Sequence, residues 1–263
     1  MTAPRRPAGI RAILLDLGGC VWRGNELVPG ARELLDGLAP RGVRRLFLSN
    51  NSTELVEGIV ARLEALGIAA GPEDVVAPLG VIGAFVRERQ GPCRVLVVGA
   101  AELAEAMRRG GHTVVPHAAY REAQAVVAGR DEAFTFQTLT AAARAVAKGA
   151  AFYVCNLDAR LPVEGGEFVP GAGAIAEAIA TAGGRRPVML GKPEPHLFRA
   201  ALDRLGLPPP AVAMLGDTLA TDILGAKRVG MTTIYFTPAG PPPDLDPTPD
   251  LVLTALGDLL PML

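Results

Sequence analysis

The sequence predicts an α/β protein with a Rossmann-like parallel sheet, interrupted by an inserted compact α/β module. Between Arg11 and Leu66, short apolar segments of strand length alternate with longer amphipathic segments of helix length. Strands that alternate with helices in this way usually pair in parallel. The alternation restarts near residue 94 and again near residue 187. This restart indicates that a second module divides the first sheet.

The N-terminal part of the chain supplies a strand–helix–strand unit. Arg11 begins an apolar segment that suits a buried strand, and Pro29 suits the first turn of the helix that follows. Ser52 or Thr53 can cap the second helix through its hydroxyl group. The predicted elements of this part are strands at 11–15 and 44–48 and helices at 29–38 and 53–66.

The remaining elements follow from the same patterns. In the middle part we expect strands at 94–98, 123–128 and 151–155 and helices at 101–109, 135–148 and 173–182. In the last part we expect strands at 187–190, 211–215 and 232–236, an edge strand at 251–253, and helices at 196–205 and 221–229. This organisation predicts a discontinuous core domain at 1–80 and 186–263, with the inserted domain at 81–185.

Composition excludes several functional classes. The 263 residues carry a net charge of -1, so no basic excess points to nucleic acid. No apolar segment has the length of a membrane helix. Three cysteines (Cys20, Cys93 and Cys155) without close spacing argue against a disulfide framework or a structural zinc site. We therefore expect a cytoplasmic protein with no nucleic-acid or membrane partner.

Polar residues that suit phosphoryl transfer follow several of the predicted strands. Asp16, Ser49 and Asp217 each stand at or just after the end of an apolar strand. In open α/β sheets the ligand site lies beyond the carboxyl ends of the strands, so one fold can bring these residues together. Lys192 lies between Gly191 and Pro193 in a tight turn, and Asp222 follows Asp217 closely enough to form an acid pair.

These segments resemble the haloacid dehalogenase (HAD) superfamily. Within it, the chain is similar to subfamily IIA, the p-nitrophenyl phosphatase, phosphoglycolate phosphatase and nucleotide phosphatase group, which carries a large α/β cap of the C2 type. The resemblance covers nearly the whole chain, and its most specific motifs are Ser49-Asn50-Asn51-Ser52 and the segment from Gly216 to Ala226. In the inserted module, Asn156-Leu157-Asp158 stands where the family usually has Asn-Pro-Asp.

The resemblance implies a role for each matching residue. Asp16 would attack phosphorus and form an aspartyl-phosphate, while Lys192 would neutralise charge on the nucleophile and on the phosphoryl group. A Mg²⁺ cofactor would lie against oxygen ligands, which suit this ion. The expected metal-binding residues are Asp16, Gly18 (through its carbonyl), Asp217 and Asp222. The expected phosphate- or substrate-binding residues are Leu17, Gly18, Ser49, Asn50, Asn51, Lys192, Asn156 and Asp158.

The chain departs from the family pattern at Gly18. Most family phosphatases have an aspartate there, whose carboxylate acts as general acid and then as general base. Glycine keeps the backbone carbonyl but lacks the carboxylate, so metal binding should survive while proton transfer should not. General acid–base catalysis contributes about 10²–10⁴-fold. Hydrolysis of alkyl phosphates should therefore be slow, and esters with good leaving groups should suffer least.

Three functions remain open at the level of the sequence. The first is a Mg²⁺-dependent phosphatase, slow or with an unusual acid, that acts on small phosphorylated metabolites. The second is an impaired protein that keeps the phosphate and metal site for binding, and the third is different HAD chemistry such as dehalogenation. The family also leads us to expect a homodimer. The role of Trp22, close to the nucleophile, is open between lining the site entrance and packing.

Overall fold

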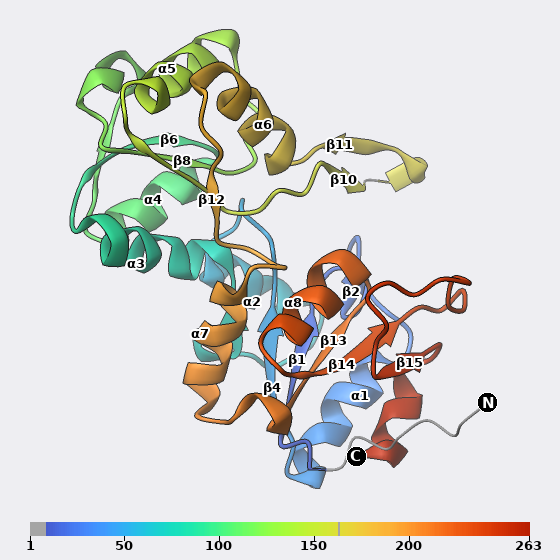
Figure 1. Cartoon of the computed structure of the whole chain (residues 1–263). Helices are drawn as coiled ribbons and strands as arrows, with labels where there is room; N and C mark the ends of the chain where they lie inside the picture. The colour runs from blue at the N-terminus through green and yellow to red at the C-terminus, as the bar shows by residue number, and fades with distance from the viewer. Residues whose placement is uncertain (1–8, 163) are drawn as a thin grey trace. The chain divides into compact units, whose positions relative to one another are not determined.

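The computed structural model describes residues 9–162 and 164–263, which form two compact units (Figure 1). The first unit contains the chain up to Ser49, Val60–Val76 and Lys192–Leu263. The second contains Asn50–Ile59 and Ala77–Gly191. The sequence predicted domain boundaries near residues 80 and 186. In the structure, the short segment Asn50–Ile59 also belongs to the second unit by its contacts.

The first unit is built on a six-stranded parallel sheet in the order β15-β14-β13-β1-β4-β5. Its strands are β1 (Ala12–Asp16), β4 (Arg44–Leu48), β5 (Val75–Val76), β13 (Val212–Gly216), β14 (Thr232–Phe236) and β15 (Leu251–Leu253). All five residues of β1 are buried because this strand lies between two neighbours and is covered on both faces. The predicted parallel α/β sheet is thereby confirmed.

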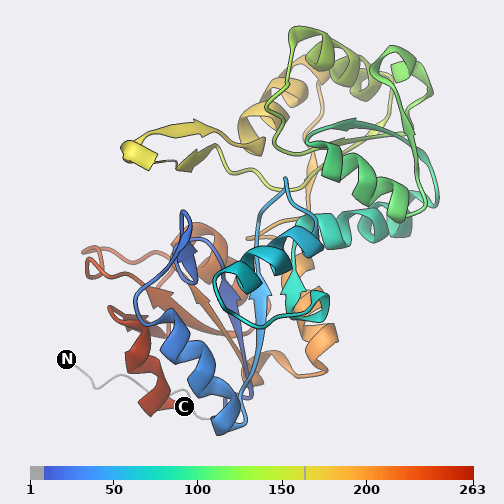
Figure 2. The ribbon, with the colours of Figure 1, turned by 180° about the vertical axis from the view of Figure 1, so that it is seen from behind.

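Helices cover both faces of this sheet. The chain crosses from β1 to β4 in one direction through α1 (Ala31–Leu38), and from β13 to β14 in the other through α8 (Leu224–Arg228). Because such crossovers are right-handed, the two helices lie on opposite faces. The C-terminal helix η7 (Leu256–Met262) packs beside α1 (Figures 1 and 2), and α7 (Pro195–Leu205) packs against α8.

The second unit has its own parallel sheet, in the order β12-β9-β8-β6-β7. Its strands are β6 (Arg94–Val98), β7 (Thr113–Val115), β8 (Ala125–Ala128), β9 (Ala151–Val154) and β12 (Val188–Met189), and its helices are α3 (Pro78–Gln90), α4 (Ala101–Arg109), α5 (Phe136–Ala147) and α6 (Ala172–Gly183). Within this unit, α5 and α6 lie on one side of the sheet and α3 and α4 on the other (Figure 1).

Several elements differ from the sequence prediction. The helix α3 was not predicted, because the glycines within Pro78–Gln90 weaken its helical pattern although its buried residues lie on one face. The predicted helix at 221–229 begins instead as a wide turn, Leu219–Ile223, followed by α8. The helix α2 (Val56–Ala65) begins later than predicted.

Two short antiparallel hairpins were also missed. They pair β2 (Trp22–Arg23) with β3 (Glu26–Leu27) and β10 (Arg160–Pro162) with β11 (Phe168–Pro170). Strands this short show too little alternation to be found from the sequence.

Within the described part of the chain, no helix combines the length and apolar character needed to cross a membrane.

Candidate functional site

The site lies at the carboxyl ends of the three central strands of the first unit. Asp16 ends β1 and is opposite Leu48, the last residue of β4, while Leu15 is opposite Leu215 near the end of β13. Because these parallel strands are aligned, Ser49, which follows β4, and Asp217, which follows β13, lie at the same edge of the sheet as Asp16. This is where the sequence predicted that the three would meet.

Lys192 lies buried between two carboxylates. Its Nζ is 2.5 Å from Asp16 Oδ1 and 2.7 Å from Asp222 Oδ1, and it donates to the carbonyl of Leu48 at 3.2 Å. Only 3% of Lys192 is exposed. Burial disfavours the charged ammonium, but the charges of Asp16 and Asp222 outweigh it, so the pKa of Lys192 is raised. The site therefore holds a permanent positive charge beside Asp16.

Asp16 itself is 9% exposed. Burial raises the pKa of its carboxyl group, the ammonium of Lys192 opposes this effect, and the charges of Asp222 and Asp217 add to it. A carboxylate must be ionised to attack phosphorus, so this site favours additional positive charge near Asp16. A bound cation would supply that charge.

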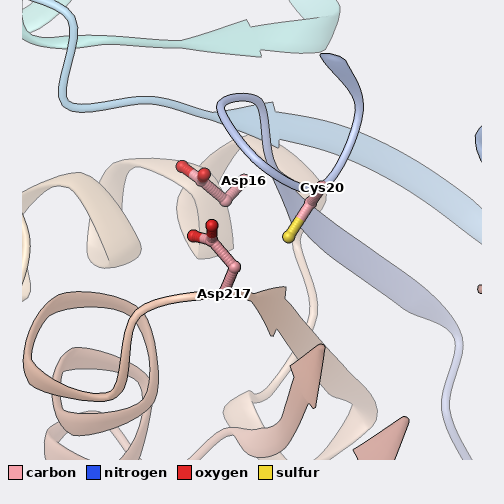
Figure 3. A group of neighbouring side chains, drawn as sticks. All are labelled: Asp16, Cys20 and Asp217. Carbon is pink, nitrogen blue, oxygen red and sulfur yellow. The ribbon is translucent and has the colours of Figure 1, made fainter. Parts of the chain in front are cut away.

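Asp217 provides a second carboxylate next to Asp16 (Figure 3). One ligand atom from each of Asp16, Asp217 and Cys20 lies within 4.8 Å of the other two. Burial, reinforced by Asp222, raises the pKa of Asp217, so a cation here would relieve repulsion among the acids. Two carboxylate groups suit a hard cation such as Mg²⁺. The residues present fit the implied metal.

From the sequence, Cys20 had no part in this site, and the cysteine spacing argued only against a disulfide or a structural zinc site. Its sulfur points toward Asp217 in Figure 3, yet the residue is fully buried. Burial raises the pKa of the Cys20 thiol well above its usual range, and the charge of Asp16 raises it further. A protonated thiol is a poor ligand for a hard cation. The oxygens of the two aspartates remain the donors suited to Mg²⁺.

Asp222 connects Lys192 to the loop that carries Asp217. It is 1% exposed, and its Oδ2 accepts the backbone N–H of Thr218 at 3.1 Å while its Oδ1 faces Lys192. The wide turn Leu219–Ile223 is what directs this side chain back toward the sheet. The structure therefore gives Asp222 a contact with Lys192, and its predicted metal contact stays a prediction.

The loop after Asp16 is held by backbone hydrogen bonds. Val21 and Trp22 donate to the carbonyl of Leu17 at 2.9 and 3.0 Å, and Gly19 donates to the carbonyl of Trp22 at 2.8 Å. Trp22 is 7% exposed and packs under the guanidinium of Arg62, 4.4 Å from the ring centre. Of the two roles left open for Trp22, the described contacts in this unit support packing.

The other predicted phosphate-binding residues fall in two groups. Ser49 belongs to the first unit, is 7% exposed, and donates its N–H to Val76 at 3.0 Å. Asn51 belongs to the second unit, where its side chain donates to Glu54 at 2.8 Å and accepts from the amide of Thr53 at 2.8 Å. These bonds form a turn that leads toward α2. The phosphate contacts of Ser49 and Asn51 remain predictions.

Asn156 and Asp158 also belong to the second unit. The Asn156 amide donates to the carbonyl of Asn50 at 2.7 Å, and its Oδ1 accepts the N–H of Asp158 at 3.1 Å. The carbonyl of Asp158 in turn accepts from Gly173 at 3.0 Å. Asn156 therefore ties the segment after Ser49 to the loop that precedes α6. The substrate contacts of Asn50, Asn156 and Asp158 remain predictions.

Gly19 is the one position in the nucleophile loop where a side chain cannot fit. Its φ is +84°, and a Cβ built there would lie 1.9 Å from Oδ2 of Asp217. Gly18, by contrast, has no heavy atom within 4 Å of such a Cβ and no positive φ. A side chain is therefore excluded at Gly19 and can be accommodated at Gly18.

We expect Gly19→Ala to weaken Mg²⁺ binding about 10- to 100-fold, the size of effect seen when residues that orient metal ligands are changed. The methyl group must displace Asp217. The alanine must also adopt a left-handed backbone conformation, which costs about 1–2 kcal/mol. Titration of Mg²⁺ by calorimetry measures the first effect and thermal unfolding the second. The matched variant Gly18→Ala should bind Mg²⁺ like the native protein. Equal affinities in both variants would contradict the close approach of Gly19 to Asp217.

Comparison with known proteins places both halves of the chain in one family. Residues 13–113 match the model described as haloacid dehalogenase-like hydrolase, and residues 189–259 match a HAD-hydrolase-like model. An acid sugar phosphatase from Staphylococcus aureus (strain MRSA252) is 35% identical over 227 residues, covering 86% of this chain and 85% of that protein.

Two solved structures are similar over nearly the whole chain. A p-nitrophenyl phosphatase from Archaeoglobus fulgidus has a TM-score of 0.88 and 28% identity, covering 97% of this chain and 99% of that one. A glycerol phosphate phosphatase from Mycobacterium tuberculosis, solved in complex with magnesium, has a TM-score of 0.85 and 30% identity. The match covers 96% of this chain and 77% of that one. With Asp16, Lys192 and Asp217 assembled at one sheet edge, the chain belongs to the haloacid dehalogenase-like hydrolases, in the subfamily IIA of the p-nitrophenyl phosphatases.

Proposed function

We propose that this HAD-type phosphoric monoester hydrolase cleaves small phosphorylated metabolites through an aspartyl-phosphate on Asp16. The observation that carries the proposal is the ammonium of Lys192, 2.5 Å from the carboxylate of Asp16 and buried with it. A buried cation fixed against a carboxylate lowers the repulsion that this carboxylate would meet on approaching a phosphate dianion. The names of the similar proteins, acid sugar phosphatase and glycerol phosphate phosphatase, support a small substrate.

The reaction would proceed in two displacements. In the first, an Asp16 oxygen forms a bond to phosphorus while the bond to the leaving oxygen breaks, and the leaving oxygen takes the electron pair. In the second, water attacks phosphorus and the Asp16 carboxylate is released with inorganic phosphate. Lys192 remains protonated throughout and stabilises negative charge near Asp16, while Asp222 holds Lys192 in place.

The metal proposed for this site is Mg²⁺, held by Asp16, Asp217 and the carbonyl of Gly18. When bound, it would neutralise negative charge on the phosphoryl group and on the two carboxylates. The chain's own contribution is to keep the buried Asp16 and the half-buried Asp217 adjacent. The glycine at position 19 leaves room for Asp217, and Asp222 fixes the amide of Thr218 beside it.

A second function is favoured by one specific observation, the absence of a carboxylate at Gly18. Without a group that donates and accepts protons, the chain could retain phosphate and Mg²⁺ binding with little turnover. The two functions differ in a simple measurement. Phosphate release from p-nitrophenyl phosphate and from glycerol 3-phosphate, each with and without Mg²⁺, should show Mg²⁺-dependent turnover that is faster for the aryl ester. Binding of phosphate without turnover of either ester would favour the second function.

We expect Asp217→Asn to reduce Mg²⁺ affinity by at least about 10-fold, because it removes one anionic oxygen donor from a cation that prefers such ligands. Calorimetric titration of Mg²⁺ measures the loss without any need for turnover. Asp203→Asn changes an exposed aspartate of α7 by the same chemistry and should leave the affinity unchanged. If Asp217→Asn binds Mg²⁺ as tightly as the native chain, the proposed metal site is wrong.

A further inference from the structure

The chain passes between its two units directly beside two residues of the phosphoryl site. Ser49 ends one segment of the first unit and is followed by Asn50, which belongs to the second unit. Lys192 begins another segment of the first unit and is preceded by Gly191, which belongs to the second. Two peptide bonds therefore connect the predicted phosphate-binding hydroxyl and the buried ammonium to the second unit. Whatever holds Asn50 and Gly191 also restrains these two residues.

The side chain of Asn156 holds Asn50. Asn156 is 4% exposed, its Nδ2 donates to the carbonyl of Asn50 at 2.7 Å, and its Oδ1 accepts the N–H of Asp158 at 3.1 Å. The first of these bonds joins residues 106 positions apart. Because the buried amide uses both its donor and its acceptor, its orientation is fixed. The chain just after Ser49 is thereby attached to the loop that follows β9.

Gly191 packs against the same side chain. Its N–H donates to the carbonyl of Cys155 at 2.8 Å, which extends the pairing of β12 with β9. A Cβ at Gly191 would lie 2.5 Å from that carbonyl oxygen, 2.7 Å from Oδ1 of Asn50 and 3.2 Å from Cβ of Asn156. The φ of Gly191 is not positive, so close packing and not backbone conformation requires glycine here. We call Asn50, Asn156 and Gly191 the crossing cluster.

A shift of the crossing cluster would act directly on the catalytic residues. Lys192 Nζ lies 2.5 Å from Asp16 and 2.7 Å from Asp222, distances that leave little room for its backbone to move. Ser49 donates its N–H to the last residue of β5 at 3.0 Å. Each residue is thus held by the first unit and also by its peptide bond to the crossing cluster. Loss of a hydrogen bond in the cluster weakens the second restraint.

We propose that Asn156 is a positioning residue for phosphoryl transfer, which acts by holding the chain where it leaves Ser49 and where it enters Lys192. The inference rests on the proposed function. It differs from the role that the family resemblance implies, in which Asn156 touches the substrate. Both hydrogen bonds described for Asn156 are to backbone atoms, as expected of a residue that orders the chain. Its effect would fall on the transferred phosphoryl group, because Ser49 and Lys192 act there.

The variant Asn156→Ala tests this role with two esters. We expect kcat/KM to fall about 10²-fold, the loss that a displacement of about 1 Å can cause. The loss should be equal for p-nitrophenyl phosphate and glycerol 3-phosphate, because both contain the same phosphoryl group. Gln137→Ala removes an exposed amide from α5 of the same unit and should change neither rate. Unequal losses would mean that Asn156 contacts the organic part of the ester, and would overturn the inference.

Binding of orthovanadate tests the inference without turnover. Orthovanadate can take the five-coordinate shape of the transferred phosphoryl group and has no organic part, so it reports on the phosphoryl site alone. In calorimetric titrations with Mg²⁺ present, Asn156→Ala should raise the Kd of orthovanadate about 10²-fold at the native stoichiometry. An unchanged Kd overturns the inference, whether the stoichiometry is native or is lowered by unfolded protein.

Gly191→Ala disturbs the same cluster from its other side. Its methyl group must displace the carbonyl of Cys155 or the side chain of Asn50, so we expect the same equal losses with both esters. Gly58→Ala adds a methyl group to an exposed position of α2 where no heavy atom lies closer than 3.8 Å, and it should have no effect.

The double variant of Asn156→Ala and Gly191→Ala separates positioning from direct contact. It should cost clearly less than the product of the two single losses, because both changes act through one displacement. Fully multiplicative losses would mean that Asn156 touches the phosphoryl group itself, and would overturn the inference.

The same experiments separate folding from function. If Asn156→Ala does not fold, a folded Gly191→Ala decides the question: equal losses with both esters support the inference, and native rates overturn it. If the native chain binds orthovanadate but cleaves neither ester, the proposed function fails, and the comparison of Kd values still shows whether Asn156 orders the phosphoryl site. A native chain that neither binds orthovanadate nor cleaves an ester refutes both proposals.

Discussion

Asp16→Asn is expected to reduce phosphate release by at least about 10⁴-fold, since the loss of a catalytic nucleophile removes most of an enzyme's rate acceleration. The amide has nearly the shape of the carboxylate, but it carries no negative charge to attack phosphorus. Lys192 keeps its second partner, Asp222, at 2.7 Å, so the buried ammonium is not left alone. Activity should therefore disappear while the fold survives.

Two measurements establish that result. Release of p-nitrophenol and of inorganic phosphate reports turnover, and thermal unfolding monitored by circular dichroism reports the fold. Asp203→Asn, an exposed aspartate on α7, is the matched control and should retain native activity. Native-like turnover by a folded Asp16→Asn protein would remove Asp16 from the role of nucleophile, and the proposed mechanism would fall with it.

The sequence predicted the part of the site that depends on the sheet. Asp16, Ser49 and Asp217 each follow an apolar strand, and aligned parallel strands must end at the same edge. The approach of Lys192 to Asp16 joins residues 176 positions apart. It was expected only because the motifs resemble a known family, since no local pattern in the sequence encodes a contact over that distance.

The features that the sequence did not predict depend on loop geometry. The nearness of Cys20 to Asp217 follows from the turn that Gly18 and Gly19 make after β1. The exposure of Arg23 follows from a hairpin whose strands have only two residues each. The helix α3 buries one face, but glycines within the segment weaken its helical pattern, so periodicity did not reveal it. Side-chain directions in such segments are set by tertiary contacts rather than by local pattern.

Gly18→Asp is expected to accelerate hydrolysis of alkyl phosphates by up to about 10²–10⁴-fold, the range that general acid–base catalysis contributes. The structure makes the substitution feasible. No heavy atom lies within 4 Å of a Cβ at Gly18, and its backbone does not require the left-handed region. The carbonyl of residue 18 is retained, so Mg²⁺ affinity should not change. Calorimetric titration of the metal checks that point separately from turnover.

The gain should depend on the substrate and on the protonation chemistry. A leaving alkoxide needs a proton, whereas p-nitrophenolate is stable as an anion, so glycerol 3-phosphate should gain more than p-nitrophenyl phosphate in the step that forms the aspartyl-phosphate. Gly18→Asn has a similar shape without an acid, and it should give no gain with either ester. This variant separates proton transfer from any effect of simply filling the space.

The same substitution should also shorten the life of the aspartyl-phosphate, because the water that attacks it needs a base. Acid quenching during turnover should trap more phosphoenzyme in the native chain than in Gly18→Asp. If both esters accelerate equally, the gain lies in this second, shared step, and the first step does not need the acid. If neither accelerates and Gly18→Asn behaves identically, another group already transfers the proton. The premise that Gly18 limits the reaction would then be wrong.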